Sequence, residues 1–268
     1  EGYINTLGNP VVAAQSLTRR FLEEGKGRHR VRAVGATGSG REIVGSLMSS
    51  CFGAGSVFVM NEIAAHAEGA LSFDPEVDTI FEIGGQDAKY IRLDGGRICD
   101  AAMNEACSAG TGSFIAEQGS KFQGVDNVVH MGQRALAADH GISLGQHCSV
   151  FMAEVIDEAV SAHVEQDAIL AGIYDSIVQN YLNRVKGSRS VGGRIFCQGM
   201  PFVSDALAAA VARQTGRQVV VPPHPGTIGA LGIARLTCKE LAVSTLAPLD
   251  LGVFFGARLD RKDTFVCK

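Results

Sequence analysis

Short apolar runs alternate with segments of helical periodicity along the first half of the chain. The runs at residues 30–36, 56–60 and 78–83 are rich in β-branched residues, which predicts strands. Residues 41–49 and 61–73 follow the first two runs and have the apolar spacing of helices. This succession of strands, glycine turns and helices is typical of α/β proteins.

The next segment predicts a β-hairpin followed by a helix. Residues 88–93 and 97–102 resemble strands and flank the turn Asp94-Gly95-Gly96. Residues 111–122 have helical spacing after a glycine-rich stretch. Because a tight turn joins antiparallel neighbours, we expect antiparallel pairing inside a mixed sheet.

The second half is richer in helix. Residues 149–163 and 168–187 have apolar positions three and four apart, so we expect two helices that pack as a pair, the second ending at Gly187. A strand, helix, strand and helix are expected in order at 193–199, 205–216, 218–223 and 226–241.

Both halves carry strands, a glycine turn and helices, which is compatible with two lobes around a cleft. We expect residues 1–103 to form an N-terminal lobe and residues 104–225 a C-terminal lobe. Residues 226–268 are expected to form a connecting helix and a tail without clear periodicity, which could lead into a further module.

Composition narrows the class of protein. With 268 residues, 46% of them hydrophobic, the chain can bury a sizeable core. A net charge of -4 and scattered Lys and Arg residues argue against nucleic acid as a partner. No apolar run reaches about 18 residues, so we expect no membrane span and a cytoplasmic protein. Glu1 rather than Met at the first position suggests a fragment.

The chain has seven cysteines and 33 glycines, whereas a disulfide-stabilised protein is usually shorter and richer in cysteine. We therefore expect a reducing compartment. No two cysteines have C-x-x-C spacing, so a metal site would have to be assembled from distant residues.

Gly84, Gly85, Gln86 and Asp87 follow a predicted strand and suggest phosphate chemistry. The two glycines could bring backbone N–H groups against phosphate oxygens, with Gln86 positioning a water and Asp87 holding Mg²⁺ through water molecules. The competing interpretation is a tight hairpin with a polar tip, since such turns are common.

A second glycine segment, Gly110-Thr111-Gly112, forms the start of the predicted helix at 111–122, whose N-terminus would face an anion. Gly199 and Met200, with Gly229 in a glycine-rich helix start, could form a nucleoside slot. Two such glycine turns in one chain indicate nucleotide binding more strongly than either turn would alone.

Cys107 and Cys148 each stand just before a predicted helix, where the helix dipole would lower the pKa of the thiol and favour a thiolate ligand. For either cysteine alone, a small core residue is the usual explanation. Two thiolates cannot complete a four-cysteine iron–sulfur site, so a cluster would need two copies of the chain. The other cysteines are expected to be core or surface residues: 51, 99, 197, 238 and 267.

Six segments together resemble one protein family in order and spacing. That family is the activator ATPases of 2-hydroxyacyl-CoA dehydratases, which includes the ATPase subunits of benzoyl-CoA reductase, and the resemblance covers about residues 30–240. The segments lie at 36–41, 61–70, 82–91, 103–114, 147–156 and 219–234.

The resemblance implies an α/β fold of the actin-like, Hsp70-like and sugar-kinase-like type, with two lobes around a nucleotide cleft. It also implies ATP or ADP and Mg²⁺ as ligands, and a [4Fe–4S] cluster shared across a homodimer through Cys107 and Cys148. Ferredoxin or flavodoxin would donate an electron, which ATP hydrolysis would help pass to an iron–sulfur dehydratase or reductase.

The chain departs from the family pattern at three places. A first phosphate loop near the N-terminus has no match, so we expect weaker phosphate binding and poor activity of this fragment. Glu82 stands where the family has Asp, and residues 197–205 keep the adenosine segment only loosely. A non-redox ATPase or phosphotransferase of the same fold, or a degenerate nucleotide-binding module, therefore remains an alternative to the electron-transfer activator.

Overall fold

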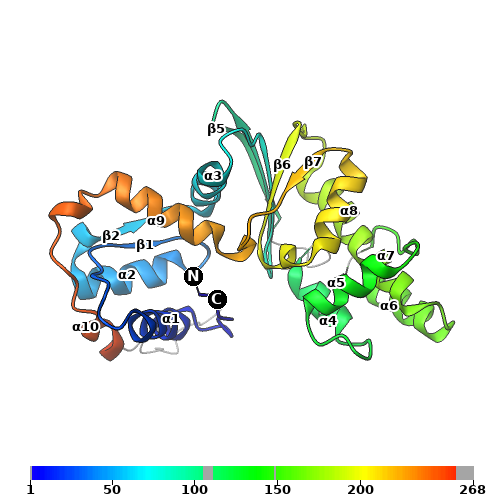
Figure 1. Cartoon of the computed structure of the whole chain (residues 1–268), viewed down its shortest axis with the longest axis horizontal. Coiled ribbons are helices and arrows are strands. Elements are labelled where there is room, and N and C mark those ends of the chain that lie inside the picture. Colours follow the sequence, from blue (N-terminus) through cyan, green and yellow to red (C-terminus); the bar gives the residue numbers. More distant parts are fainter. Residues whose placement is uncertain (1, 105–110, 148, 258–268) are drawn as a thin grey trace, which may run out of the picture. The chain divides into compact units, whose positions relative to one another are not determined.

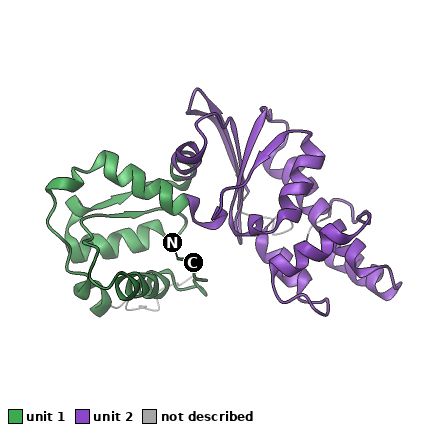
Figure 2. Cartoon of the chain, viewed as in Figure 1, with its two compact units in different colours: residues 1–65, 229–268 green, residues 66–228 purple. Residues whose placement is uncertain are grey.

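Two units make up the chain in this computed structural model, which describes residues 2–104, 111–147 and 149–257. The first unit consists of residues 1–65 and 229–268, and the second of residues 66–228 (Figure 2). The lobe boundary expected at residues 103 and 104 lies inside the second unit.

A parallel pair of short strands, β1 (Val34–Ala36) and β2 (Val57–Val59), lies in the first unit. Val57 of β2 packs with Met48 and Phe254 in a small hydrophobic core. The helices that contribute to this unit are α1 (Pro10–Gly25), α2 (Arg41–Phe52), α9 (Ile228–Glu240) and α10 (Leu251–Gly256) (Figure 1).

The strands β1 and β2 and the helices α2 and α9 confirm the sequence prediction, whereas α1 and α10 were missed. The helix α1 has clear local signals, because Pro10 occupies its first turn and the Asn9 side chain accepts a hydrogen bond from the Val12 amide at 3.2 Å. The helix α10 has only six residues, which is too short to establish a period.

A five-stranded sheet with the order β5-β4-β3-β6-β7 forms the centre of the second unit. Its strands β3, β4 and β5 pair antiparallel, whereas β3, β6 and β7 pair parallel, so the predicted mixed sheet is confirmed. Gly95 and Gly96 have φ of 53° and 76° and form the two-residue turn expected between β4 and β5. The bounds are Thr79–Ile83, Ala88–Asp94, Arg97–Asn104, Arg194–Gln198 and Gln218–Val220 for β3 to β7.

Helices cover both faces of this sheet. Phe73, the last residue of α3, packs against Phe196 of β6 with ring centroids 6.3 Å apart. Phe81 of β3 packs against Tyr181, the residue that follows α7, with ring centroids 4.8 Å apart. Because Phe81 pairs in register with Cys197, the neighbour of Phe196, the two phenylalanines point to opposite faces. The helices are α3 (Glu62–Phe73), α4 (Gly112–Gly119), α5 (Val128–Ala137), α6 (Ser149–Ser161), α7 (Gln166–Asn180) and α8 (Asp205–Thr215).

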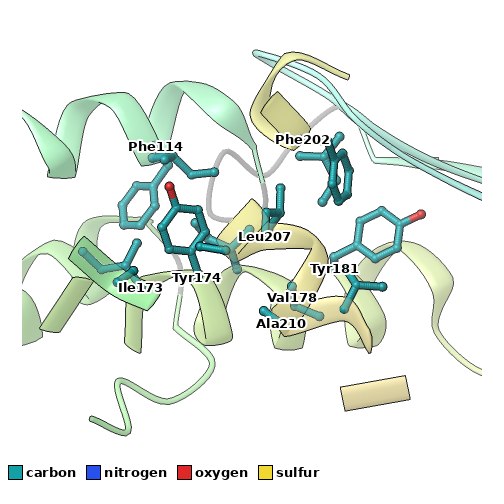
Figure 3. Packing of buried hydrophobic residues seen from close by; sticks show 14 of the residues in the cluster. Phe114, Ile173, Tyr174, Val178, Tyr181, Phe202, Leu207 and Ala210 are labelled. Carbon is teal, nitrogen blue, oxygen red and sulfur yellow. The ribbon is translucent and has the colours of Figure 1, made fainter. Parts of the chain in front are cut away.

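The largest core of the second unit lies on the α7 face of the sheet. Figure 3 shows its close packing around Phe114, Tyr174, Tyr181 and Phe202. The predicted contact between α6 and α7 is confirmed. The helix α5 was missed, because it is short and has Gly132 in its middle, which weakens the helical signal.

The second of the two predicted long helices is not α-helical throughout. The α-helix α7 ends at Asn180, and a π-helix, η3 (Tyr181–Lys186), continues it. Gly187, with φ of 57°, ends the segment as expected. Among the residues that the structure describes, no helix is long and apolar enough to cross a bilayer.

Candidate functional site

The hairpin loop Gly84–Asp87 lies at the carboxyl end of β3, next to the carboxyl end of the parallel strand β6. The Gly84 amide donates to the Asp87 carbonyl oxygen at 2.9 Å and closes the loop. Gly85 and Gln86 at its tip are exposed, whereas Asp87 is half-buried. Ligands in α/β sheets bind outside the carboxyl ends of strands, so this loop occupies a typical ligand-binding position.

The first turn of α4 is hydrogen-bonded to the hairpin loop. The Gly112 amide donates to the Gly84 carbonyl oxygen at 2.8 Å, and the Ser113 amide donates to the Gly85 carbonyl oxygen at 3.0 Å. The two glycine segments singled out in the sequence therefore lie side by side. Two amides that were expected to face an anion instead hold the hairpin loop.

Gly112 permits a close approach of three segments. A Cβ atom at this position would lie 2.6 Å from Cγ of Pro201 and 3.2 Å from the Gly84 carbonyl oxygen. Pro201 belongs to the 3-10 helix η4 (Met200–Val203), which follows β6. Only a residue without a side chain lets α4, η4 and the hairpin loop meet here.

Gly199 and Met200 join the same region from the end of β6. Gly199 has φ of 108°, and a Cβ atom there would overlap the Ile83 carbonyl oxygen. Its amide donates to the Pro225 carbonyl oxygen at 2.8 Å, and Gly226 packs directly against the Met200 side chain. The predicted nucleoside-binding residues 199 and 200 therefore adjoin the hairpin loop, while Gly229 belongs to α9 in the first unit.

A buried cluster of charges supports the loop. The Lys89 ammonium lies 3.0 Å from a carboxylate oxygen of Glu82 and 3.0 Å from one of Asp87. The side chains of Lys89 and Glu82 are only 2% and 6% exposed. Burial by itself would lower the pKa of Lys89, but the two carboxylates outweigh it, so the pKa of Lys89 is raised above its ordinary value.

Sequence reasoning missed Lys89 and assigned no role to Glu82. The two residues are register partners on β3 and β4, which places them on one face of the sheet. A lysine inside an otherwise apolar strand was a usable signal, because a buried lysine needs an anionic partner.

Gln198 is a further buried polar residue at this edge. It pairs in register with Glu82 and is fully buried, and neither atom of its side-chain amide has a hydrogen-bond partner among the described residues. Lys89, Glu82 and Gln198 thus form a polar row across β4, β3 and β6. From the sequence alone, residues 197–205 were distinguished only by their departure from the family pattern, and Gln198 was not singled out.

The predicted cluster ligands Cys107 and Cys148, and Gly110 of the second glycine segment, lie outside the described residues. In the described parts of the chain, no group of three or more His, Cys, Asp or Glu residues is arranged to hold a metal ion. Cys197 is a core residue, and burial strongly raises the pKa of its thiol. Cys51 is half-buried, and Cys99 and Cys238 are exposed.

The profile of the BadF/BadG/BcrA/BcrD ATPase family matches residues 10–236, which is most of the chain. The chain belongs to this family. The match includes the hairpin loop, α4 and the segment after β6, so the described site lies within the part that BadF/BadG/BcrA/BcrD ATPases share.

Relatives with established names support this membership. The 2-hydroxyisocaproyl-CoA dehydratase activator of Clostridioides difficile is 29% identical over 245 residues, which cover 90% of this chain and 91% of the relative. A solved structure of the activator from Clostridium difficile with bound ADPNP is 27% identical with a TM-score of 0.75, over 91% of this chain and 85% of that chain.

Component A of (R)-2-hydroxyglutaryl-CoA dehydratase from Acidaminococcus fermentans gives a TM-score of 0.69 at 26% identity, over 78% of this chain and 76% of that chain. These likenesses confirm the predicted fold class, and this BadF/BadG/BcrA/BcrD family member has the actin-like ATPase fold.

Proposed function

We propose that this protein is an ATP-dependent electron-transfer activator that works in the cytoplasm on an iron–sulfur acyl-CoA dehydratase or reductase. The observation that carries the proposal is the match to an ATPase family over residues 10–236, together with relatives named as dehydratase activators. The direct contact between the hairpin loop and α4 supports it, because it joins the two segments that the proposal assigns to nucleotide binding.

The hairpin loop would hold the phosphate groups of ATP or ADP. Apart from Gly85 itself and its two chain neighbours, no described residue has an atom within 4 Å of where a Cβ of Gly85 would be, so a phosphate oxygen has room to approach the backbone. Gln86, exposed at the tip, would orient the attacking water. Gly110, Thr111 and Gly112 would also take part in nucleotide binding, and Gly199 and Met200 would contact the nucleoside.

The charges at the loop fit a hydrated Mg²⁺ ion. The ammonium of Lys89 and the carboxylates of Glu82 and Asp87 leave one net negative charge, and the Asp87 side chain is 26% exposed. Mg²⁺ usually keeps several waters and binds proteins through one or two carboxylates. Asp87 would therefore hold the ion through water molecules, while Lys89 keeps the carboxylate in place.

Cys107 and Cys148 of two copies would together bind one [4Fe–4S] cluster, which makes the active protein a homodimer. In sequence, Cys148 immediately precedes α6, and the Cys107 segment connects β5 to α4, the helix bonded to the hairpin loop. When bound, the cluster would carry one electron from ferredoxin or flavodoxin to the partner enzyme.

Anaerobic purification followed by iron and sulfide analysis tests the cluster. We expect about four iron atoms per dimer, the content of one [4Fe–4S] cluster, and loss of most of that iron in Cys107→Ser and Cys148→Ser. Cys238→Ser serves as the control, because this exposed thiol in α9 has no assigned role. An iron-free wild-type protein that hydrolyses ATP would contradict electron transfer and indicate a non-redox ATPase or phosphotransferase.

A further inference from the structure

The junction between α7 and the π-helix η3 is a structural irregularity that the nucleotide site does not explain. The α-helical pattern stops at Asn180, and the Gly187 amide donates five residues back to the Leu182 carbonyl oxygen at 2.9 Å. Asn180 and Tyr181, the two residues at the junction, are 1% and 0% exposed. Short π-helical segments are rare and frequently occur at functional sites.

Tyr181 connects the junction to the strand that carries Lys89. Its hydroxyl donates to the Lys89 carbonyl oxygen at 2.7 Å, and this bond is buried. The Lys89 side chain in turn holds Glu82 and Asp87 at the hairpin loop. Burial raises the pKa of Tyr181 well above its ordinary value, so the hydroxyl stays protonated and keeps donating.

Asn180 connects the same junction to the segment before Cys148. Its side-chain amide donates to the His147 carbonyl oxygen at 3.3 Å. One turn earlier on α7, the Ser176 hydroxyl donates to the Gly145 carbonyl oxygen. Residues 145–147 are thus attached by two hydrogen bonds to the helix that ends at the junction.

We propose that Asn180 and Tyr181 are positioning residues that couple nucleotide binding at the hairpin loop to the conformation of residues 145–147. They are consecutive, buried and part of one continuous helix, so a shift of β4 at Lys89 moves the donor to His147 with it. The proposal rests on the proposed function, because it takes the loop as the nucleotide site. It adds a defined hydrogen-bonded path from that loop to the residue before Cys148.

Hydrogen exchange of the full chain with and without Mg·ADP tests the coupling. In the wild type, we expect nucleotide to slow exchange at residues 84–87 and also, by about fivefold, in a peptide covering residues 143–147, the lower end of usual couplings between sites. Tyr181→Phe removes only the hydroxyl, so protection at 84–87 should remain while the effect at 143–147 falls below about twofold.

Tyr174→Phe is the matched control. Like Tyr181, Tyr174 is a buried tyrosine, but it lies within α7 and its hydroxyl donates to the Val128 carbonyl oxygen at 3.2 Å. The two hydroxyls point to different parts of the core (Figure 3). This variant should keep the full response at 143–147. Equal responses in the two tyrosine variants would overturn the coupling.

Asn180→Asp provides a second test should Tyr181→Phe fold poorly. The carboxylate has the shape of the amide but cannot donate to His147, so the response at 143–147 should again be lost. Asn183→Asp is its control, because among the described residues Asn183 donates only to the Gln179 carbonyl oxygen, one turn earlier. If the wild type shows protection at 84–87 but no response at 143–147, the coupling is contradicted and the nucleotide site is not. No protection at 84–87 contradicts the nucleotide site as well.

Discussion

Among single residues, Lys89 determines whether the carboxylates of Glu82 in β3 and Asp87 in the hairpin loop can lie close together. Its ammonium is nearly inaccessible to water and contacts both Glu82 and Asp87. Replacing such a buried group by an apolar one removes the positive charge that contacts both carboxylates. The same contact holds the Asp87 carboxylate, which we propose as the Mg²⁺ residue, in a fixed place.

Lys89→Met should therefore lower the free energy of unfolding by about 3 to 5 kcal/mol, the usual loss when one partner of a buried ion pair is removed. Urea denaturation at neutral pH measures the change. Lys121→Met is the control, because Lys121 forms a more exposed ion pair with Asp157 at 2.6 Å and should contribute less than about 1 kcal/mol. Similar losses in the two variants would show that Lys89 is not a buried charge.

The raised pKa of Lys89 also predicts how stability depends on pH. A group whose pKa is raised by folding contributes its full stability below its unfolded pKa, about 10.4 for lysine, and loses it as the pH rises through the folded value. The stability difference between wild type and Lys89→Met should be constant from pH 7 to about 10 and shrink above that range. Urea denaturation at several alkaline pH values measures it. A difference that grows with alkaline pH would contradict a raised pKa.

At the scale of elements, the site depends on the close approach of α4, η4 and the hairpin loop. Gly112→Ala places a Cβ atom 2.6 Å from Pro201, so we expect the unfolding free energy to fall by about 1 to 3 kcal/mol, as for other overpacked sites. Denaturation in urea measures the loss.

Gly85→Ala is the control for this loss. Among the described residues, Gly85 has open space where its Cβ would lie, and its φ is not in the left-handed region, so alanine should change the unfolding free energy by less than about 0.5 kcal/mol. If Gly112→Ala is as stable as Gly85→Ala, the described contact between α4 and η4 is wrong.

The sequence predicted those elements whose pattern is local. The Asp94-Gly95-Gly96 turn, the strand before Gly84 and the helix after Thr111 follow from turn chemistry and periodicity. The π-helix at Tyr181 could not be predicted in this way, because its residues continue the helical pattern of α7. Its geometry depends on packing and on a hydrogen bond to a strand 92 residues away in sequence.

The same limit applies to the site. The loop from Gly84 to Asp87 could be found from the glycine turn alone. The hydrogen bonds that the Gly112 and Ser113 amides donate to this loop could not, because they form only when distant parts of the sequence meet in the fold. Lys89 and Glu82 become a pair only once the register of β3 and β4 is known. The roles of Cys107 and Cys148 stay predictions.

At the scale of the whole molecule, most of the proposed site belongs to one unit. The hairpin loop, α4, η4 and residues 145–147 all lie within residues 66–228. The path from Lys89 through Tyr181 and Asn180 to His147 is also contained in this unit, so its hydrogen bonds do not depend on how the two units are arranged.

If nucleotide phosphates bind at the Gly84–Asp87 loop, a side chain at Gly85 should obstruct them, and isothermal titration of Mg·ADP into wild type and Gly85→Ala measures this effect. The alanine methyl group would occupy the open space beside the loop without destabilising the fold. We predict binding to the wild type and at least about tenfold weaker binding to Gly85→Ala, equivalent to about 1.4 kcal/mol. Equal affinity of the two proteins, or no binding to the wild type, would contradict phosphate binding at this loop.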